Sequence, residues 1–401
     1  MTASGRPASD VVVIGAGAVG AAVAFFAARQ GLAVTIVDRS GPASGTSSRG
    51  EGNVLISDKE LGPELQLARH SLRVWREDLA EFASLWEFDA KGGIIVASAE
   101  SSLISLERLI AAQRQHGITV ERLDEDALRS AEPHVTRQAH GAAYYPDDCQ
   151  VQPMLVASHL VRLGRQHGVR LLAGATVTGL LRQDRRVRGV RTTAGDVPCD
   201  VVVNAAGPWA ARIAAMAEVR VPVQPRRGFV LVTEPMPPTV HHKVYAAEYV
   251  DNVGSSDAGL QASAVVEGTA SGTVLVGSTR ERVGFDHTTS FDALRVLARN
   301  GVALFPFLAN VRALRHYHGF RPYSPDHLPV LGPDPRAAGL WHACGHEGAG
   351  IGLSVGTGKL LAQALAGQST DLDLAPFAPE RFGDAGTLLD TQDGDGCVTS
   401  R

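Results

Sequence analysis

The segment VVVIGAGAVGAAVAFFAARQGLAVTIVDR, residues 11–39, restricts the fold more than any other part of the sequence. Its first eighteen residues are uncharged and mostly apolar, which is compatible with a secretory signal, a membrane helix or a nucleotide-binding unit. A signal peptide would follow a basic segment, whereas only Arg6 precedes the run. The run is barely long enough to span a bilayer, and its three glycines favour a turn. We therefore expect a nucleotide-binding unit and no membrane span.

The order of residues in this segment predicts a strand, a glycine turn, a helix and a second strand. Residues 11–14 form the first strand, residues 21–30 the helix and residues 33–37 the second strand, which ends at Asp38. Gly15 permits the tight turn, Gly17 allows a pyrophosphate to approach the backbone, and Gly20 lets the helix pack on the strand. Asp38 can accept hydrogen bonds from a ribose hydroxyl. This pattern predicts a bound dinucleotide and leaves open whether it is FAD or NAD.

Composition excludes several other classes of protein. The formal net charge of −4 and the lack of basic runs make nucleic acid an unexpected partner. Cys149, Cys199, Cys344 and Cys397 are too widely spaced for a zinc site or a disulfide framework, which favours the cytoplasm. The histidines show no spacing that indicates metal ligands, so no metal is expected.

The rest of the chain predicts two interleaved domains in a mixed α/β fold. Helices and strands alternate up to about residue 218, and glycine-rich turns return near the C-terminus. Between them, from 219 to 307, strand-like segments follow without the alternating helices, and a closing helix is expected near FDALRVLARNGVALF. The nucleotide-like segments at the two ends must meet in space. We expect a discontinuous Rossmann-like FAD-binding domain and an antiparallel-sheet substrate domain. The expected boundaries are 8–85, 142–218 and 317–377 for the first, 86–141 and 219–316 for the second, and a flexible tail at 378–401.

Five segments resemble the D-amino-acid oxidase superfamily of FAD-dependent oxidoreductases, which includes glycine and sarcosine oxidases. They are residues 11–39, GTSSRGEGN, VVVNAAGPWA, GFRPYSPDHLPVLG and HACGHEGAGIGLSVGTGKLLA. Three further phrases, SDKELGPELQLARHSLRVW, EYVDNVGSSDAGLQ and GSTRERVGFD, look closer to the flavin subunits of hydrogen cyanide synthase, opine oxidases and D-hydroxyproline dehydrogenase. Those subunits work with small partner chains. The resemblance therefore implies possible partner subunits or an electron carrier here.

The resemblance implies FAD as the cofactor, bound without a covalent link. The cysteine that anchors flavin in sarcosine oxidases corresponds to a position near Gly319. The small and hydroxyl residues of the loop after Asp38 suit phosphate or the flavin edge. A helix that follows the C-terminal glycine motif would stabilise the reduced ring. The expected cofactor residues are Gly15, Gly17, Ala18, Val19, Gly20, Asp38, Arg39, Thr46, Ser47, Ser48, Gly52, Asn53, Val177, Ala206, Gly207, Trp209, Gly348, Ala349, Gly350 and Ile351.

The same resemblance implies a small amino- or imino-acid substrate. Arg321 stands where the family places the arginine that pairs with the substrate carboxylate, and its planar fork suits this role. Tyr245 and Tyr249 are both candidates for the tyrosine that faces the substrate, and His346 is a weaker candidate from its place in the glycine motif. Ser48 and Glu51 are candidates for contact with phosphate or substrate, and Glu51 could equally cap the following turn. Either tyrosine could instead be an ordinary sheet residue.

The reaction expected from these residues is oxidation of a Cα–N bond to an imine by hydride transfer to flavin N5. Sarcosine oxidases use a lysine to activate oxygen, and none of the four lysines in this chain is obviously at the matching place. A dehydrogenase that passes electrons to a partner is therefore favoured over an oxidase that makes hydrogen peroxide. An NAD-dependent dehydrogenase and a non-catalytic escort subunit with the same fold remain as alternatives.

Overall fold

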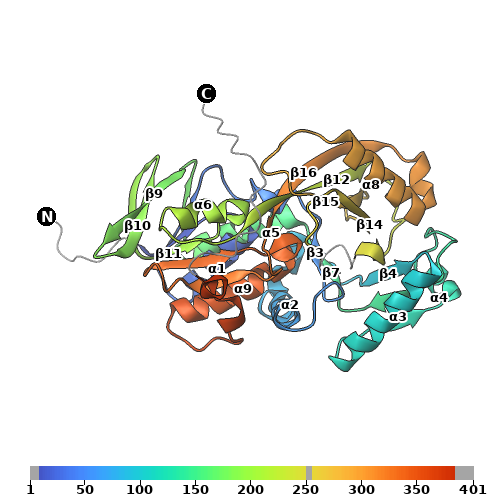
Figure 1. The fold of residues 1–401 in the computed structure, drawn as a ribbon, viewed down its shortest axis with the longest axis horizontal. Helices are drawn as coiled ribbons and strands as arrows, with labels where there is room; N and C mark the ends of the chain where they lie inside the picture. The colour runs from blue at the N-terminus through green and yellow to red at the C-terminus, as the bar shows by residue number, and fades with distance from the viewer. Residues whose placement is uncertain (1–8, 250–254, 384–401) are drawn as a thin grey trace.

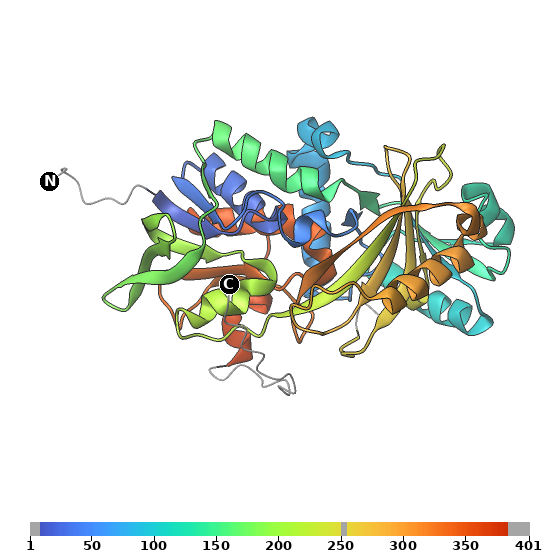
Figure 2. The same ribbon diagram turned by 90° about the horizontal axis from the view of Figure 1, so that it is seen from above.

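The computed structural model describes residues 9–249 and 255–383. Two lobes lie side by side in it, each built on a sheet of eight strands (Figures 1 and 2). One lobe contains the N-terminal strand and helix, and the other contains the antiparallel strands of the middle of the chain. The mixed α/β architecture predicted from the sequence is confirmed.

The first sheet has β1 (Ser9–Ile14) at its centre, in parallel pairing with β2 (Val34–Asp38) on one side and β11 (Gly195–Asn204) on the other. All four residues from Val11 to Ile14 are almost fully buried, as expected for a central parallel strand that is covered on both faces. The sheet continues with β8 (Arg170–Ala173) beyond β2, and with β18 (Leu340–Cys344) and β17 (Val330–Pro333) beyond β11. A hairpin of β9 (Val177–Gln183) and β10 (Arg186–Thr192) extends from β11.

Three helices pack together beside this sheet, and two of them approach each other closely. Helix α1 (Ala18–Arg29) packs against α9 (Gly350–Leu365) and α5 (Pro153–Gln166). A side chain at Gly358 would place its Cβ 2.6 Å from the backbone carbonyl carbon of Ala22. The alanines and glycines of the two helices therefore allow a backbone approach that larger residues would prevent. This contact joins the two ends of the chain, as the sequence predicted.

The second sheet follows the order β16-β12-β15-β14-β13-β4-β6-β5. Its pairs are antiparallel except for β13 with β4, which are parallel and depart from the purely antiparallel pattern expected. Helix α8 (Phe291–Leu304) packs on β14, β15 and β12, at the position predicted for the closing helix. The strands are β4 (Gly93–Ala97), β5 (Glu121–Leu123), β6 (Gly141–Tyr145), β12 (Gln224–Thr233), β13 (Lys243–Ala246), β14 (Gln261–Gly268), β15 (Val274–Arg280) and β16 (Ala313–Tyr323).

Shorter elements connect the two lobes. Helix α2 (Pro63–Arg73) continues into a π-helical turn (Val74–Asp78) and a 3-10 segment (Ala80–Trp86). The pair β3 (Asn53–Val54) and β7 (Cys149–Gln150) forms a two-stranded sheet beside them. The remaining helices are α3 (Glu100–Gln115), α4 (Glu125–Ala131) and α6 (Ala210–Ala215).

The strands also show where the chain passes between the sheets. β6 and β16 belong to the second sheet along their whole length, so that sheet extends beyond residues 141 and 316, where the sequence placed boundaries. Pairing with β4 and β12 holds these extra residues. The domain division itself stays a prediction. In the expected tail, residues 379–382 form a 3-10 turn with Phe382 largely buried, and residues 384–401 lie outside the described residues, together with residue 8.

The apolar N-terminal run is thus divided between a strand and a helix of 12 residues. Within residues 9–249 and 255–383, no helix has the length and apolar character needed to cross a bilayer. The described cysteines Cys149, Cys199 and Cys344 are buried and unpaired with one another.

The contact between α1 and α9 predicts a sensitive position at Gly358. We expect Gly358→Ala to destabilise the protein by about 1–3 kcal/mol, because the added methyl group forces the helices apart. Gly41→Ala is the matched control, since a Cβ there has no neighbour within 4 Å. Thermal unfolding should show a melting temperature several degrees lower for G358A only. Equal melting temperatures would contradict the described helix contact.

Candidate flavin and substrate site

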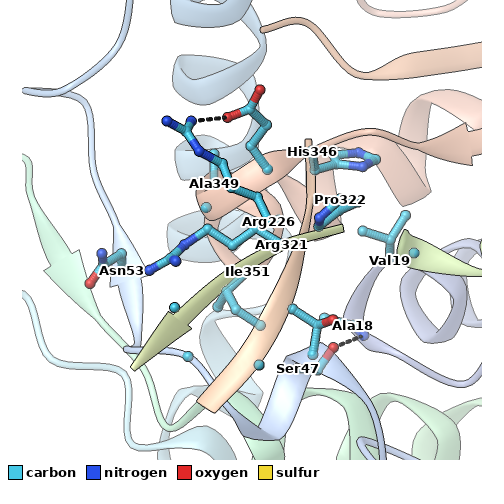
Figure 3. Close-up of a pocket in the computed structure, with 18 of the residues that line it drawn as sticks. Ala18, Val19, Ser47, Asn53, Arg226, Arg321, Pro322, His346, Ala349 and Ile351 are labelled. Atoms are coloured by element: carbon cyan, nitrogen blue, oxygen red, sulfur yellow. Dashed lines mark hydrogen bonds and ion pairs between the residues drawn. The ribbon is translucent and has the colours of Figure 1, made fainter. Parts of the chain in front are cut away.

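The main pocket opens where the carboxyl ends of β1, β11 and β18 face strands β12 and β16 of the second sheet. It encloses about 1340 Å³, part of which is open to solvent. Figure 3 shows its lining, with Arg226 and Arg321 side by side and Ala18, Val19 and Ser47 at another part of the wall. Segments from both ends of the chain therefore line one cavity, at the edge where α/β sheets bind ligands.

The N-terminal glycines have the geometry of a nucleotide-binding turn. Gly15 has φ of 111°, and a Cβ there would lie 2.4 Å from the carbonyl oxygen of Ala205. A Cβ on Gly20 would lie 2.1 Å from the carbonyl oxygen of Gly15. Gly17 precedes α1 and provides no side-chain cap, and Ser47 Oγ accepts a hydrogen bond of 2.9 Å from the backbone N–H of Ala18. The start of α1 therefore presents its positive end to the pocket.

A second group of predicted cofactor residues lies around the end of β2. The Asp38 carboxylate accepts hydrogen bonds from the backbone N–H groups of Ala16, Ser40 and Gly41. The guanidinium of Arg39 lies 3.8 Å from the ring centroid of Trp209. Asp38 thus holds the glycine turn and the following loop together, in addition to the ribose contact expected of it.

The C-terminal glycine motif lies at the start of α9, which begins at Gly350. Gly348, Ala349, Gly350 and Ile351 line the pocket. The residue before α9 provides no side-chain cap, so backbone N–H groups are available to a ligand. Free backbone N–H groups and the positive end of the helix dipole would stabilise negative charge on the edge of a bound ring.

The structure brings most of the predicted residues to the lining of the pocket, and the others are not part of that lining. Residues in the lining are Gly17, Ala18, Val19, Thr46, Ser47, Asn53, Gly207, Tyr249, Arg321, His346, Gly348, Ala349, Gly350 and Ile351. Predicted residues outside the lining are Gly15, Gly20, Asp38, Arg39, Ser48, Gly52, Val177, Ala206, Trp209 and Tyr245. Gly52 packs against Val151, and the Ser48 hydroxyl donates to the carbonyl of Gly45 at 3.3 Å.

Of the two candidate tyrosines, only Tyr249 borders the pocket. The hydroxyl of Tyr245 is buried in a network with the Asp148 carboxylate, at 2.6 Å, and the hydroxyl of Ser57. This network joins β13 to the segment after β3, so Tyr245 has the structural role that the sequence left open. Burial raises the pKa of Tyr249, which keeps its phenol neutral.

His346 lines the pocket but is not suited to acid–base chemistry. Its Nε2 lies 3.0 Å from the hydroxyl of Thr357. Burial lowers the pKa of His346 to about 3, so the ring is neutral at physiological pH. The expectation of a catalytic role for His346 therefore lacks support in the geometry, and the side chain anchors the glycine motif to α9.

Several charged residues of the pocket were missed as site residues. Arg226 on β12 and Arg280 on β15 share the pocket with Arg321 on β16. Arg226 is the direct cross-strand partner of Arg321. A charged residue within an otherwise apolar strand pattern could have indicated them. Charged side chains are rarely buried in a strand unless they have a partner or a functional role. Other unexpected lining residues are Arg49, Asp58, Lys59, Glu60, Glu64, Pro322, His327, Cys344 and Glu347.

Glu51, which the sequence left undecided, is buried at the pocket. Burial raises the pKa of its carboxyl group to about 7, against the opposing charge of Lys243 and with an added contribution from Glu267. Its Oε1 atom has no hydrogen-bond partner among the described residues. Glu51 therefore changes charge near neutral pH, close to Arg280 and Arg321.

Lys59 has a side chain that borders the pocket, and the expectation that no lysine stands at the oxygen-activating place stays a prediction. Its Nζ lies 2.7 Å from Asp58 Oδ1 and 3.6 Å from Glu64 Oε1. Although burial lowers the pKa of Lys59, these two carboxylates raise it above the usual value. Lys59 is a protonated ammonium with its charge compensated.

These features fit an FAD group. The close glycine contacts leave room only for backbone beside a phosphate, and the residues that precede α1 and α9 provide no side-chain cap. The buried Oδ1 atom of Asn53 in the lining has no partner among the described residues. Gly319 lies in the lining, and the nearby Cys344 has its pKa raised to about 12 by burial, so its thiol is a poor nucleophile. Noncovalent binding stays a prediction.

Comparison with known proteins identifies the class. Residues 10–364 match the family described as FAD dependent oxidoreductase (DAO), and the chain belongs to that family. It is 33% identical to hydrogen cyanide synthase subunit HcnC of Pseudomonas aeruginosa, over 93% of this chain and 96% of that protein. The crystal structure of glycine oxidase from Geobacillus kaustophilus superposes with a TM-score of 0.85 at 27% identity, covering 94% and 99% of the two chains. The predicted family, fold class and cofactor are thereby confirmed.

The contact between Ser47 and the start of α1 predicts a role in FAD affinity. We expect Ser47→Ala to weaken FAD binding about fivefold, because it removes a hydrogen bond worth about 1 kcal/mol and a polar group of the lining. Ser48→Ala is the control, because its hydroxyl donates to the carbonyl of Gly45 in the same loop. Titration of the apoprotein with FAD measures both dissociation constants. Equal constants for S47A and S48A would contradict this assignment.

Proposed function

We propose that the protein oxidises the Cα–N bond of a small amino or imino acid to an imine. The observation that carries this proposal is Arg321. Its Nη1 donates to the carbonyl of Thr279 at 2.8 Å, and no described carboxylate lies within ion-pair distance of its guanidinium. A half-buried arginine that borders this pocket can bind a substrate carboxylate through two parallel hydrogen bonds.

The relatives support an amine substrate. Hydrogen cyanide synthase and the glycine oxidases of Pseudomonas and Geobacillus match nearly the whole chain. The name of the glycine oxidases indicates glycine as the substrate of those proteins. D-proline, D-hydroxyproline, glycine and opines are therefore the compounds to test here.

The residues of the chain position the substrate more than they move protons. Arg321 binds the carboxylate, and Tyr249 closes the wall beside Arg280, whose guanidinium lies 5.3 Å from the tyrosine ring. A flavin held by the turn after β1 and the start of α9 would supply the acceptor for a hydride from the substrate Cα, with the amine lone pair forming the C=N bond. The substrate amine releases its proton to solvent on binding, so the reaction does not depend on a histidine base. Holding the Cα–H in place supplies most of the catalytic effect in this scheme.

Electrons pass next to a partner chain or carrier in this proposal. The word subunit in the name of HcnC supports such an assembly. The position of Lys59 favours the alternative, a hydrogen-peroxide-forming oxidase, because a cation beside reduced flavin promotes oxygen reduction. Since Asp58 and Glu64 already compensate that charge, we favour the dehydrogenase. A non-catalytic escort subunit would bind FAD without being reduced by any amine.

Substitution of Arg321 tests the proposal directly. We expect Arg321→Gln to lower kred/Kd for anaerobic flavin reduction on the order of 100-fold, because the substrate carboxylate loses a charged partner in a buried site. Arg315→Gln is the control, as Arg315 lies on the same strand but is exposed. Stopped-flow absorbance measures both variants against the amines named above. If no amine bleaches the flavin of the wild type, the proposed function is wrong.

The pKa of Glu51 predicts a pH dependence. Below about pH 7 the carboxyl group is protonated, and above it the ionised group competes with a substrate carboxylate for Arg280 and Arg321. Lys243 and Glu267 also face this group. The affinity for a non-oxidisable carboxylate such as propionate should therefore fall as pH rises through 7.

Glu51→Gln should remove this step and keep the low-pH affinity at all pH values. Flavin absorbance titrations from pH 6 to about pH 9 measure it, in the range set by the raised carboxyl pKa. An unchanged pH profile in E51Q would show that another group titrates.

Reoxidation of the reduced enzyme separates the dehydrogenase from the oxidase. We expect slow reoxidation by oxygen, fast reoxidation by a dye acceptor, and little change in Lys59→Met, because the charge of Lys59 is compensated. Lys359→Met is the control, as Lys359 pairs with Asp78 and Asp371 outside the pocket. Rapid oxygen use that falls in K59M alone would support the oxidase.

A further inference from the structure

We propose that Glu51 takes up the proton of the substrate amine before that proton reaches solvent, which makes Glu51 the general base of the reaction. This inference rests on the proposed function and adds a catalytic residue to it. The transfer breaks an N–H bond and leaves its electron pair on nitrogen, while the proton forms an O–H bond on the Glu51 carboxylate. The electron pair on nitrogen is the one that then forms the imine.

Hydrogen bonds from two strands fix the backbone on either side of Glu51. The carbonyl of Gly50 accepts a hydrogen bond of 3.2 Å from the Tyr317 hydroxyl on β16. The backbone N–H of Gly52 donates to Glu267 Oε1 on β14 at 3.3 Å. A general base must stay within hydrogen-bond reach of the proton that it removes. These contacts hold the Glu51 carboxylate at a constant place although it belongs to a loop.

The carboxyl group of Glu51 is buried, and it borders the pocket. Gly277 on β15 leaves the space for this group, since a Cβ there would lie 2.1 Å from Glu51 Oε1. The Oε1 atom has no hydrogen-bond partner among residues 9–249 and 255–383. A buried carboxylate oxygen without a partner is costly, and an N–H group of a ligand in the pocket would satisfy it.

Glu51 lies close to the arginine that is proposed to bind the substrate carboxylate. Arg321 Nη1 donates to the carbonyl of Thr279, which follows Gly277 on β15 by two residues. The charge of Arg321 lowers the pKa of Glu51, and the charge of Glu51 raises the pKa of Arg321 against the effect of burial. In an α-amino acid the nitrogen and the carboxylate are attached to the same carbon. A substrate held by Arg321 therefore brings its amine within reach of Glu51.

Substrate binding makes Glu51 a stronger base. Burial raises the pKa of Glu51 to about 7, and Arg321 is one of the cations that oppose this rise. A substrate carboxylate on Arg321 compensates that cation, so the pKa of Glu51 rises further in the complex. The amine then lies beside a carboxylate whose proton affinity has grown.

The other charges around Glu51 do not reverse this effect. Lys243 and Glu267 form a buried ion pair with each other, and they change the pKa of Glu51 in opposite directions. The titratable or charged groups that face Glu51, besides Arg321, are Lys243 on β13, Tyr249, Glu267 on β14, Arg280 on β15 and Tyr317 on β16.

The first measurement is the pH dependence of anaerobic flavin reduction in the wild-type holoprotein, with an amine that bleaches it. We expect kred to rise as pH increases above 7, because only the ionised Glu51 carboxylate accepts a proton. The affinity for propionate, which has no amine, should fall over the same range. These opposite signs separate a base from a group that only competes for arginine. A kred that is constant or falls between about pH 6 and pH 9 would overturn the proposal.

The second measurement assigns the base to Glu51. Glu51→Gln has the shape of the protonated acid and should lower kred on the order of 100-fold, as expected for loss of a general base, and remove the pH step. Glu107→Gln is the control, because Glu107 is exposed on α3 and pairs with Arg122. An unchanged kred in E51Q, or a step kept at the same pH, would assign the titration to the substrate amine and overturn the proposal.

A conservative variant covers the case in which E51Q yields no holoprotein. Glu51→Asp keeps the carboxylate but withdraws it from the pocket by one methylene group. It should keep the pH step and lower kred. A kred equal to that of the wild type would contradict direct proton transfer to this residue.

The third measurement does not depend on turnover. 2-Aminoisobutyrate has no hydrogen on Cα, so it binds as an amino acid without being oxidised. Infrared difference spectra of its binding to the holoprotein at about pH 8, above the pKa of free Glu51, should show a new band from a protonated carboxyl group. The band should be absent in E51Q and present in E107Q. Its absence from the saturated wild type would overturn the proposal.

Failure of this proposal differs from failure of the proposed function. Bleaching of the wild type by an amine, with an unchanged kred in E51Q, would refute Glu51 as the base and leave the proposed function intact. Bleaching by no amine would refute the proposed function itself.

Discussion

Parallel pairing of β1 with both β2 and β11 is the constraint on which the rest of the structure depends. It brings the turn after β1, the loop after β2 and the turn after β11 to one edge of the sheet. Because β18 pairs in parallel with β11, the C-terminal glycine motif reaches the same edge. The close contacts of Gly15 with Ala205 and of Gly358 with α1 are possible only in this arrangement. The same strand pairing therefore positions the glycine turns of the pocket and the contact between α1 and α9.

Much of the fold and of the cofactor site could be predicted from the sequence, because short local patterns indicate them. The glycine spacing with strand, helix and acid indicated the dinucleotide unit, and strands β12, β14 and β15 lie within the stretch 219–307 that was expected to be strand-like. The charged wall could not be predicted, since it depends on register. Which of Arg226 and Arg227 faces the pocket follows from the pleat of β12 and its pairing with β16. Likewise, only tertiary contacts separate Tyr245, bonded to Asp148, from Tyr249 at the pocket.

The electrostatics of the pocket follow from the same geometry. Strands β12, β15 and β16 contribute cations, and the residues before α2 contribute most of the acids, with Lys59 between Asp58 and Glu64. The charges are thus segregated within one lining. Such an arrangement binds a substrate with its carboxylate toward the sheet. Hydride transfer from Cα requires the same substrate orientation in every turnover. It also explains why a buried Glu51 with a pKa near 7 is tolerated beside the arginines.

The most direct test of the central claim is a crystal structure of the FAD-bound protein with a non-oxidisable carboxylate ligand. The structure predicts FAD along the turn after β1 and the start of α9, and a ligand carboxylate within hydrogen-bond distance of the Arg321 guanidinium, between the flavin and strands β12 and β16. A ligand bound elsewhere, or an Arg321 side chain that faces away from it, would contradict the assignment of this pocket as an amino-acid oxidation site.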